Sequence, residues 1–506
     1  MNAINVRRRA FLASTAGGLG LSSVLGALQP LAADETKLAG GVAPLSDEIE
    51  PLVQFLERTP RDSIIGETAR RVRNGLSYRR LLAALLLAGV RNVQPRPSVG
   101  FKFHAVLVVN SAHLASLSGT DEERWLPIFW AIDNFKQSQQ RDIEEGNWTL
   151  PPVEVRAVPD AGAAIEALTG ALDRWDEPAA DAAITAVVRN FGSAAVFDLL
   201  APYAARDFRS IGHKVIYLSN AFRTLQTVGW DYAEPVMRSL VYAMLNHNGE
   251  PNPSQSDLAP DRPGRQNLLR AEKRQGPLVI GKPDTGATGE LLRALHTATA
   301  DEAGEQVTAM LDDGVSVASL WDAVFSGAAE LLLRQRGIVS LHAVTTTNAI
   351  RQAFSAASSD QTRRYLLMQN ASFLTMFRDA AQSRGELSDD RIDEMKPIEP
   401  ENGRAEIANV FATMGQSRKK SAQEMLGALQ SGTEPREVVD HARRLVFLKG
   451  NDSHDYKFSS AALEDYRVIS APWRNRFLAA SMQQLCSPNE KTRPLVKQIE
   501  QALVRG

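Results

Sequence analysis

Apolar residues spaced for helices are the feature that most constrains the fold of this chain. Leucine and alanine recur every three or four positions at residues 78–90, and comparable spacing occurs at 163–175, 196–201 and 290–298. Side chains with this period lie on one face of a helix, and that face must be buried against other helices. The sequence therefore predicts a mainly α fold that forms a single large helical domain.

Three histidines share one local pattern, in which a valine follows the imidazole by two positions and an asparagine comes soon after. The three segments are 103–106, 212–215 and 341–344, in which His104, His213 and His342 are followed by Asn110, Asn220 and Asn348. Neutral imidazole is the commonest protein ligand for zinc, iron and copper. Two interpretations are open: histidine-bearing helices surround a central metal site, or an internal duplication has placed histidines in the core.

The residues around the three segments predict their secondary structure and which histidines can share a site. Val106, Val215 and Val344 are β-branched and also suit strands, but alanine-rich, arginine-containing sequence follows each segment without a turn signal, which favours helices. His113 lies nine positions after His104, so on one helix the two side chains point to opposite sides. We therefore expect helices at all three segments and leave His113 out of the predicted site.

Residues 1–33 have the features of a twin-arginine signal peptide. Arginines at positions 7–9 precede Phe11 and Leu12, a weakly apolar stretch follows, and Ala32-Ala33 offers a cleavage site. The twin-arginine translocation machinery carries folded proteins, often with a cofactor already inserted. We expect the mature protein to be periplasmic or otherwise exported by this pathway. We also expect it to lack a membrane span, because no later segment has the ~18 apolar residues required.

Charge and cysteine content exclude several classes of partner and cofactor. The net charge is -2, which gives no electrostatic reason to expect binding to nucleic acid or to an anionic membrane. Cys486 is the only cysteine, which excludes an internal disulfide, an iron–sulfur cluster, a cysteine-rich zinc site and covalently attached c-type haem. Any metal must be held by histidine, by carboxylate or by a less usual ligand.

A fourth histidine lies near the C-terminus and precedes a lysine. His454 and Lys457 are three positions apart and share one face of a helix if that helix is capped by Ser453, and Glu464 falls on the same face. A protonated lysine cannot ligate a metal. It can do so only after losing its proton or after reacting with carbon dioxide to form a carbamate. The alternative is a surface lysine that pairs with Asp455 or Glu464.

Three widely spaced histidines followed by His-x-x-Lys resemble the questin oxidase family, helical oxygenases known mainly from fungal aromatic polyketide pathways. The resemblance covers residues 101 to about 478. It implies non-haem iron, Fe²⁺, that activates dioxygen beside an aromatic or quinone-like small-molecule substrate, with oxygen insertion or C–C cleavage as the outcome. The metal ligands that it implies are His104, His213, His342, His454 and Lys457 as the carbamate.

The resemblance also suggests how the rest of the chain is organised. Polar side chains expected to lie behind the ligands and fix the imidazoles are Asn110, Asn220, Asn348 and Glu464. An N-terminal helical extension is expected at 34–100 and the questin oxidase-like domain at 101–506. Within that domain, a segment at about 249–289 is rich in Pro, Gly, Asp and Arg and is predicted to be a long surface loop. The signal, the extension and this loop depart from the fungal pattern.

Two other function classes remain open. A zinc-dependent hydrolase would hold Zn²⁺ with the same histidines and use a carboxylate base such as Glu234 or Glu330, although the chain has no His-Glu-x-x-His motif. A non-catalytic helical periplasmic binding protein would explain the repeated segments as stacked units. The intervals between the segments exceed one hundred residues, however, whereas ordinary helical repeats span ~34 to 47.

Overall fold

The computed structural model describes residues 41–95, 101–117, 119–120, 123–245, 249–274, 276–401, 403 and 405–504. The predicted signal peptide lies outside these residues. Within them the chain forms α-helices and short 3-10 turns and contains no strand, which confirms the mainly α prediction. None of the helices in these ranges is both long enough and apolar enough to cross a membrane.

The helices follow one another along the whole described chain. In order they are α2 (Glu50–Arg58), α3 (Arg61–Arg73), α4 (Tyr78–Asn92), α5 (His104–Leu107), α6 (Val109–Ser116), α7 (Leu126–Glu145), α8 (Ala164–Arg174), α9 (Glu177–Asn190), α10 (Ser193–Ala204), α11 (His213–Val228), α12 (Ala233–Met244), α13 (Arg262–Lys273), α14 (Thr285–Leu295), α15 (Ala300–Asp312), α16 (Val317–Arg334), α17 (Ile338–Ala356), α18 (Asp360–Gln382), α19 (Ile407–Thr413), α20 (Arg418–Gln430), α21 (Pro435–Lys449), α22 (Ser453–Asp465), α23 (Ala471–Ser481) and α24 (Pro494–Val504).

Helices α2 to α4 belong to the same compact unit as the histidine segments, since residues 41–506 cluster as one unit. Helix α4 is buried along most of its length and packs against α11 and α12. Arg91 of α4 is fully buried and pairs with Glu50 at 2.8 Å and with Glu57 at 2.7 Å, which ties α4 to α2. A buried guanidinium needs such partners because desolvation of an unpaired charge is costly. Residue 100 therefore marks no boundary between compact units.

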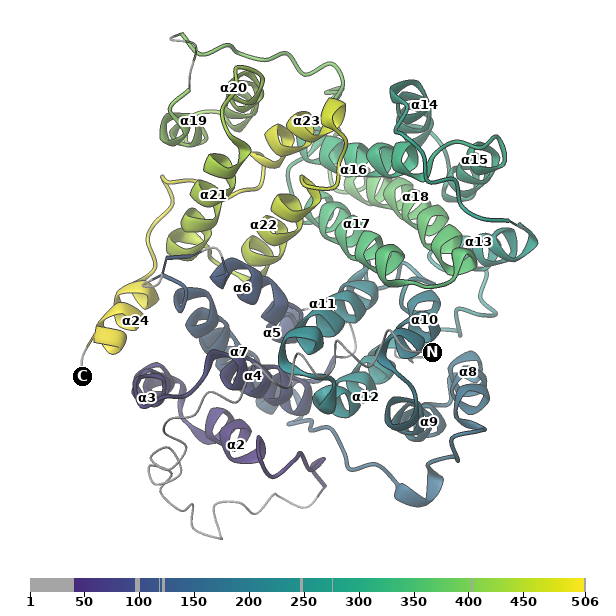
Figure 1. Ribbon diagram of the computed structural model, residues 1–506, viewed down its shortest axis with the longest axis vertical. Helices are drawn as coiled ribbons and strands as arrows, with labels where there is room; N and C mark the ends of the chain where they lie inside the picture. The colour runs from purple at the N-terminus through teal and green to yellow at the C-terminus, as the bar shows by residue number, and fades with distance from the viewer. Residues whose placement is uncertain are drawn as a thin grey trace, which may run out of the picture. The chain divides into compact units, whose positions relative to one another are not determined.

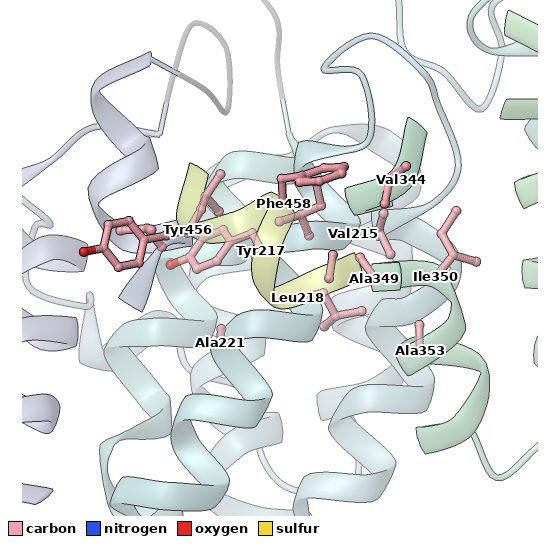
Figure 2. Packing of buried hydrophobic residues seen from close by; sticks show 14 of the residues in the cluster. Val215, Tyr217, Leu218, Ala221, Val344, Ala349, Ile350, Ala353, Tyr456 and Phe458 are labelled. Atoms are coloured by element: carbon pink, nitrogen blue, oxygen red, sulfur yellow. The ribbon is translucent and has the colours of Figure 1, made fainter. Parts of the chain in front are cut away.

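The histidine-bearing helices lie at the centre of this unit, as predicted. Figure 1 shows α5, α6, α11, α17 and α22 grouped around the middle of the view, with the other helices outside them. Helix α17 packs against α11 and α22, and α6 packs against the same two helices. Figure 2 shows apolar side chains of α11, α17 and α22 filling the space between them, including Val215, Val344 and Phe458. The β-branched segments thus form helices, and burial outweighs their strand preference.

The segment 249–289 is not one long loop. It contains α13 and the start of α14, so the prediction is wrong for those residues. Helix α13 escapes detection by apolar spacing because polar and small residues make its buried contacts. Asn267 donates to Gln369 and to Ser372 at 2.9 Å, and a Cβ at Gly264 would lie 1.9 Å from the Arg206 carbonyl oxygen. The backbone of α13 can approach that carbonyl only because residue 264 is glycine.

Candidate metal centre

Four histidines from four separate segments enter the centre near the beginnings of their helices. His104 is the first residue of α5, His213 is the first residue of α11, and His454 is the second residue of α22. His342 lies in the second turn of α17. The amino end of a helix carries a partial positive charge, which disfavours an imidazolium and keeps the ring neutral. Neutral rings are the form that can ligate a metal.

The four rings form one cluster. His213 Nε2 lies 3.1 Å from His104 Nε2 and 2.9 Å from His342 Nε2. The ring of His454 is centred 4.6 Å from that of His104 and 5.2 Å from that of His342. One ligand atom from each of His104, His342 and His454 lies within 4.8 Å of the others, and this group of described residues consists of histidines alone. A duplication that merely filled the core would not bring these nitrogen atoms together.

Hydrogen bonds at the opposite ring nitrogens fix the tautomers. His213 Nδ1 donates to the Ser210 carbonyl at 2.8 Å, and His342 Nδ1 donates to the Ile338 carbonyl at 2.7 Å. A carbonyl oxygen can only accept, so each Nδ1 carries the proton and each Nε2 presents a lone pair. Two lone pairs that face each other at 2.9 Å repel unless a cation lies between them. This arrangement can hold a metal ion.

The distances from His213 Nε2 to His104 Nε2 and to His342 Nε2 fit one ion bound by these rings. At a typical metal–imidazole distance of about 2.1 Å, nitrogens 2.9 to 3.1 Å apart subtend an angle of roughly 90°. A regular tetrahedron at the same distance would place them roughly 3.4 Å apart. Right angles are typical of five- and six-coordinate ions with nitrogen and oxygen ligands. The spacing of these atoms therefore allows one metal ion to be bound by the cluster.

Helix α22 begins with an aspartate that also reaches the site. Its N-cap is Asp452 rather than the predicted Ser453: the Asp452 carboxylate accepts the His454 backbone N–H at 2.7 Å, and Asp455 accepts the Asp452 N–H at 3.2 Å. This reciprocal pair is a capping box. The same carboxylate oxygen of Asp452 lies 3.2 Å from His454 Nδ1. A carboxylate in this position holds a ligating imidazole in the tautomer that leaves Nε2 free for a metal.

Lys457 lies one turn beyond His454 on α22 and is buried, with 3% of its surface exposed. Its Nζ has no hydrogen-bond partner among the described residues. Asp455 is used in the capping box and Glu464 pairs with Arg223, so the alternative of a surface ion pair is wrong. Burial lowers the pKa of Lys457 to about 7. An amine of this kind is available to ligate a metal or to react with carbon dioxide.

Burial also sets the charge of the rings. It lowers the pKa of His213 and of His342 well below the usual histidine value, and the nearby Lys457 lowers both further. Both shifts favour the neutral imidazole at His213 and at His342, which agrees with the tautomers that the carbonyl contacts impose.

Strained backbone brings α11 against α17. Ile211 and Gly212 have φ values of 43° and 80°, and a positive φ is an outlier for a β-branched residue. A Cβ at Gly212 would lie 2.2 Å from Thr346 Oγ1 of α17, and Thr346 donates to the Ile211 carbonyl at 3.3 Å. This close contact immediately precedes His213. It sets the separation at which His213 meets His342.

The asparagines and the glutamate predicted to hold the imidazoles bond to one another and to neighbouring groups instead. Asn220 donates to the Leu107 carbonyl at 2.9 Å and lies 3.5 Å from Asn110, while Asn348 donates to Asp465 at 2.7 Å and to Glu464 at 3.2 Å. They form a polar layer beside the cluster. The bonds that orient three of the rings come from the Ser210 and Ile338 carbonyls and from Asp452.

Sequence reasoning missed all three of these orienting groups. Asp452 was detectable, since an aspartate two positions before His454 at the start of a helix is a strong N-cap. The two carbonyls carry no signal in the sequence, because every residue has one.

The other candidate residues lie outside the cluster. Glu234, considered as a hydrolytic base, pairs with Arg189 at 2.8 Å, and Glu330 lies 2.6 Å from His296. His113 Nδ1 lies 3.0 Å from the Tyr78 hydroxyl, in agreement with its exclusion on helical geometry. Neither carboxylate of the hydrolase hypothesis belongs to the converging group.

Comparisons of this chain with protein-family models, with curated proteins and with solved structures gave no match. What the site can do is therefore judged from its own geometry, as a buried histidine cluster that can hold a metal ion.

Proposed function

We propose that the protein is an exported non-haem iron oxygenase whose Fe²⁺ is held by His104, His213, His342 and His454. One observation carries the proposal: the Nε2 lone pairs of His213 and His342 face each other at 2.9 Å, with their tautomers fixed by carbonyl acceptors. A metal ion bound by both atoms would stabilise that arrangement. The resemblance to the questin oxidase family adds the choice of iron and of oxidative chemistry.

Lys457 completes the proposed ligand set as its carbamate. Its unpartnered Nζ is buried one turn from His454, where a solvated surface lysine would not lie. A carbamate would supply the anionic oxygen ligand that complements histidine in Fe²⁺ sites. When bound, the metal would activate dioxygen for oxidation of an aromatic or quinone-like small molecule, by oxygen insertion or C–C cleavage.

The chain itself supplies orientation and exclusion of water. The Ser210 and Ile338 carbonyls keep the proton on Nδ1 of His213 and of His342, and Asp452 does the same for His454. Burial favours the neutral form of His213 and of His342, and their hydrogen bonds aim both Nε2 atoms at the cluster before a metal binds.

Metal analysis of protein purified through its native export route tests the proposal. We expect about one equivalent of iron per chain, lost in His213→Ala and in His454→Ala because each removes a ligand from a converging set. His113→Ala is the matched control, since it removes a buried histidine outside the cluster and should retain the iron. One equivalent of zinc instead would favour the hydrolase. Protein that takes up neither metal would overturn the metal centre.

The lysine is tested separately. Lys457→Ala should lower iron occupancy at ambient carbon dioxide, and wild-type protein prepared in ¹³C-bicarbonate should show a carbamate carbon signal that the variant lacks. Full iron occupancy in Lys457→Ala would show that Lys457 is not a ligand, and the histidine site would then stand without it.

Export is the remaining part of the proposal. Replacing Arg8 and Arg9 together by lysine should leave the full-length protein in the cytoplasm, because the twin-arginine pathway reads that pair. Cell fractionation followed by immunoblotting measures this. Normal export of the double variant would argue for another secretion route.

A further inference from the structure

A second feature lies at the outer end of the groove between α11 and α17. A cleft of about 300 Å³ opens between α10, α11 and α17, within the size range of small-molecule sites. Two aromatic rings, Phe197 and Phe222, line it and meet edge to face at 4.6 Å. Polar side chains surround the rings, among them Arg223, Ser219 and Gln352. The cleft thus combines an aromatic wall with one cationic side chain.

The cleft continues inward through Arg223. The same side chain lines a second cavity of about 10 Å³, enough for about one water molecule, between α6, α11, α17 and α22. Asn220, Asn348 and Lys457 also line this inner cavity. Lys457 lies about one turn of helix from His454, and Asn220 and Asn348 lie about two turns from His213 and His342. A continuous series of polar side chains therefore connects the cleft with the neighbourhood of the histidine cluster.

Arg223 is occupied from the inner side by a carboxylate. Glu464 of α22 forms an ion pair with its guanidinium and also accepts Asn348 Nδ2 at 3.2 Å. Both partners of the ion pair are mostly shielded, with 16% and 26% of their side chains exposed. Arg223 lines both the cleft and the inner cavity, and Glu464 holds its guanidinium from α22. An arginine fork binds carboxylates in general, so a ligand carboxylate can take the place of the Glu464 carboxylate.

We propose that this cleft binds a small molecule that combines a flat apolar ring with a carboxylate. The ring packs against Phe197 and Phe222, and the ligand carboxylate displaces Glu464 from Arg223. Displacement of Glu464 frees Arg223, which also lines the inner cavity that contains Lys457. As a substrate site the cleft rests on the proposed function, whereas the binding step needs only Arg223 and the two rings. The two proposals can therefore fail separately.

Binding of benzoate to the full-length mature protein, measured by isothermal titration calorimetry, tests the cleft. Arg223→Gln should weaken benzoate binding by about tenfold or more, because it removes the charged partner of the carboxylate. Glu464→Gln should tighten binding several-fold, because the internal competitor for Arg223 is gone. Arg61→Gln is the matched control: this arginine lies on α3, pairs with Asp133 and is not part of the cleft lining, so its loss should leave benzoate affinity unchanged.

The two variants are expected to change benzoate affinity in opposite directions. A variant that folds poorly would only lose affinity, so tighter binding in Glu464→Gln has no such explanation. Wild-type protein should also prefer benzoate to the isosteric neutral benzamide. Equal binding of the two probes, or weaker benzoate binding in Glu464→Gln, would overturn the proposal. Measurements on metal-free and metal-loaded protein separate the two hypotheses: benzoate binding with these variant effects in a protein that takes up no metal supports the cleft alone. Iron uptake without benzoate binding leaves the metal centre and removes the cleft.

Discussion

The histidine rings of this protein are oriented by groups that are not themselves conspicuous. Two Nδ1 atoms donate to the Ser210 and Ile338 carbonyls, which belong to the turn before α11 and to the first turn of α17. The third orienting group is Asp452. One of its carboxylate oxygens caps α22 by accepting the His454 backbone N–H and also contacts His454 Nδ1. At the scale of single residues, the site is therefore built mostly by the local backbone, and side chains contribute where a helix begins.

Asp452 allows these two roles to be separated. Asp452→Asn should keep α22 capped, because asparagine is an equally good N-cap, so the midpoint of thermal unfolding should change little. It should weaken metal binding by about tenfold or more, since the carboxylate that orients His454 is lost. Competitive metal titration measures the affinity. Asp452→Ala is the comparison and should lose both. Unchanged affinity in Asp452→Asn would show that the carboxylate acts only as a cap.

Asp465 provides a pH-dependent test at the same scale. It is buried, its Oδ1 accepts from Asn348 at 2.7 Å, and burial raises its pKa well above the usual carboxyl value. A raised folded-state pKa means that the native state binds more protons than the unfolded state above about pH 4, so its contribution to stability falls as pH rises. Asp465→Asn removes that dependence. The unfolding midpoint of the variant, relative to wild type, should increase from pH 4.5 to 7.5. A constant difference would contradict the assignment.

At the scale of helices, the position of His213 depends on how closely α11 approaches α17. Gly212 permits both the left-handed backbone and the contact with Thr346. The other two histidine segments have Phe103 and Leu341 at this position, so the glycine is the exception within the repeated pattern. The exception is explained by packing, since only hydrogen fits in the available space.

Gly212→Ala should destabilise the protein by roughly 3 kcal/mol or more, as left-handed backbone costs about 1–2 kcal/mol and overpacking adds about 1–3 kcal/mol. Gly314 is a matched control with a φ of 78° and nothing within 4 Å of an added Cβ. Gly314→Ala should therefore lose only the backbone part. Chemical denaturation measures both variants. Thr346→Ala combined with Gly212→Ala should recover part of the loss, and a strictly additive double variant would rule out the steric contact.

At the scale of the whole molecule, the N-terminal helices support the centre. Helix α4 lies against α11, which carries His213, and Arg91 links α4 to α2 through Glu50 and Glu57. A chain that began at residue 101 would lack the apolar face of α4 and expose part of α11. Residues 41–95 are for this reason part of the folded unit, although their sequence contains none of the repeated pattern.

Arg91→Met tests this support. It leaves two carboxylates without their buried partner, which costs about 3–5 kcal/mol. We expect a lower unfolding midpoint and, because α4 packs against α11, reduced metal occupancy at elevated temperature. Arg61→Met is the control, because Arg61 pairs with Asp133 at 2.7 Å while half exposed, and such pairs contribute little. Equal stability of the two variants would show that the buried network does not hold the N-terminal helices.

The helical fold and the set of clustered histidines could be predicted from the sequence, because both depend on local information. Apolar spacing states which face of a helix is buried, and repeated His-x-Val segments mark residues that share an environment. The same reasoning missed α13, whose buried face is polar and glycine-containing. It also gave Asn110, Asn220 and Asn348 a role that the hydrogen bonds assign to backbone carbonyls.

What the sequence determined by itself was the helical fold and the three histidines of the repeated pattern as candidates for one site, since periodicity and spacing are properties of residue type and order. His454 and Lys457 joined these candidates through the resemblance. What only the tertiary structure decided was the arrangement of the side chains around the histidine cluster. The approach of His213 to His342, the burial of Lys457 and the contact of Arg223 with Glu464 depend on atoms from helices more than a hundred residues apart. Distances between such atoms are set by packing, and no local pattern encodes them.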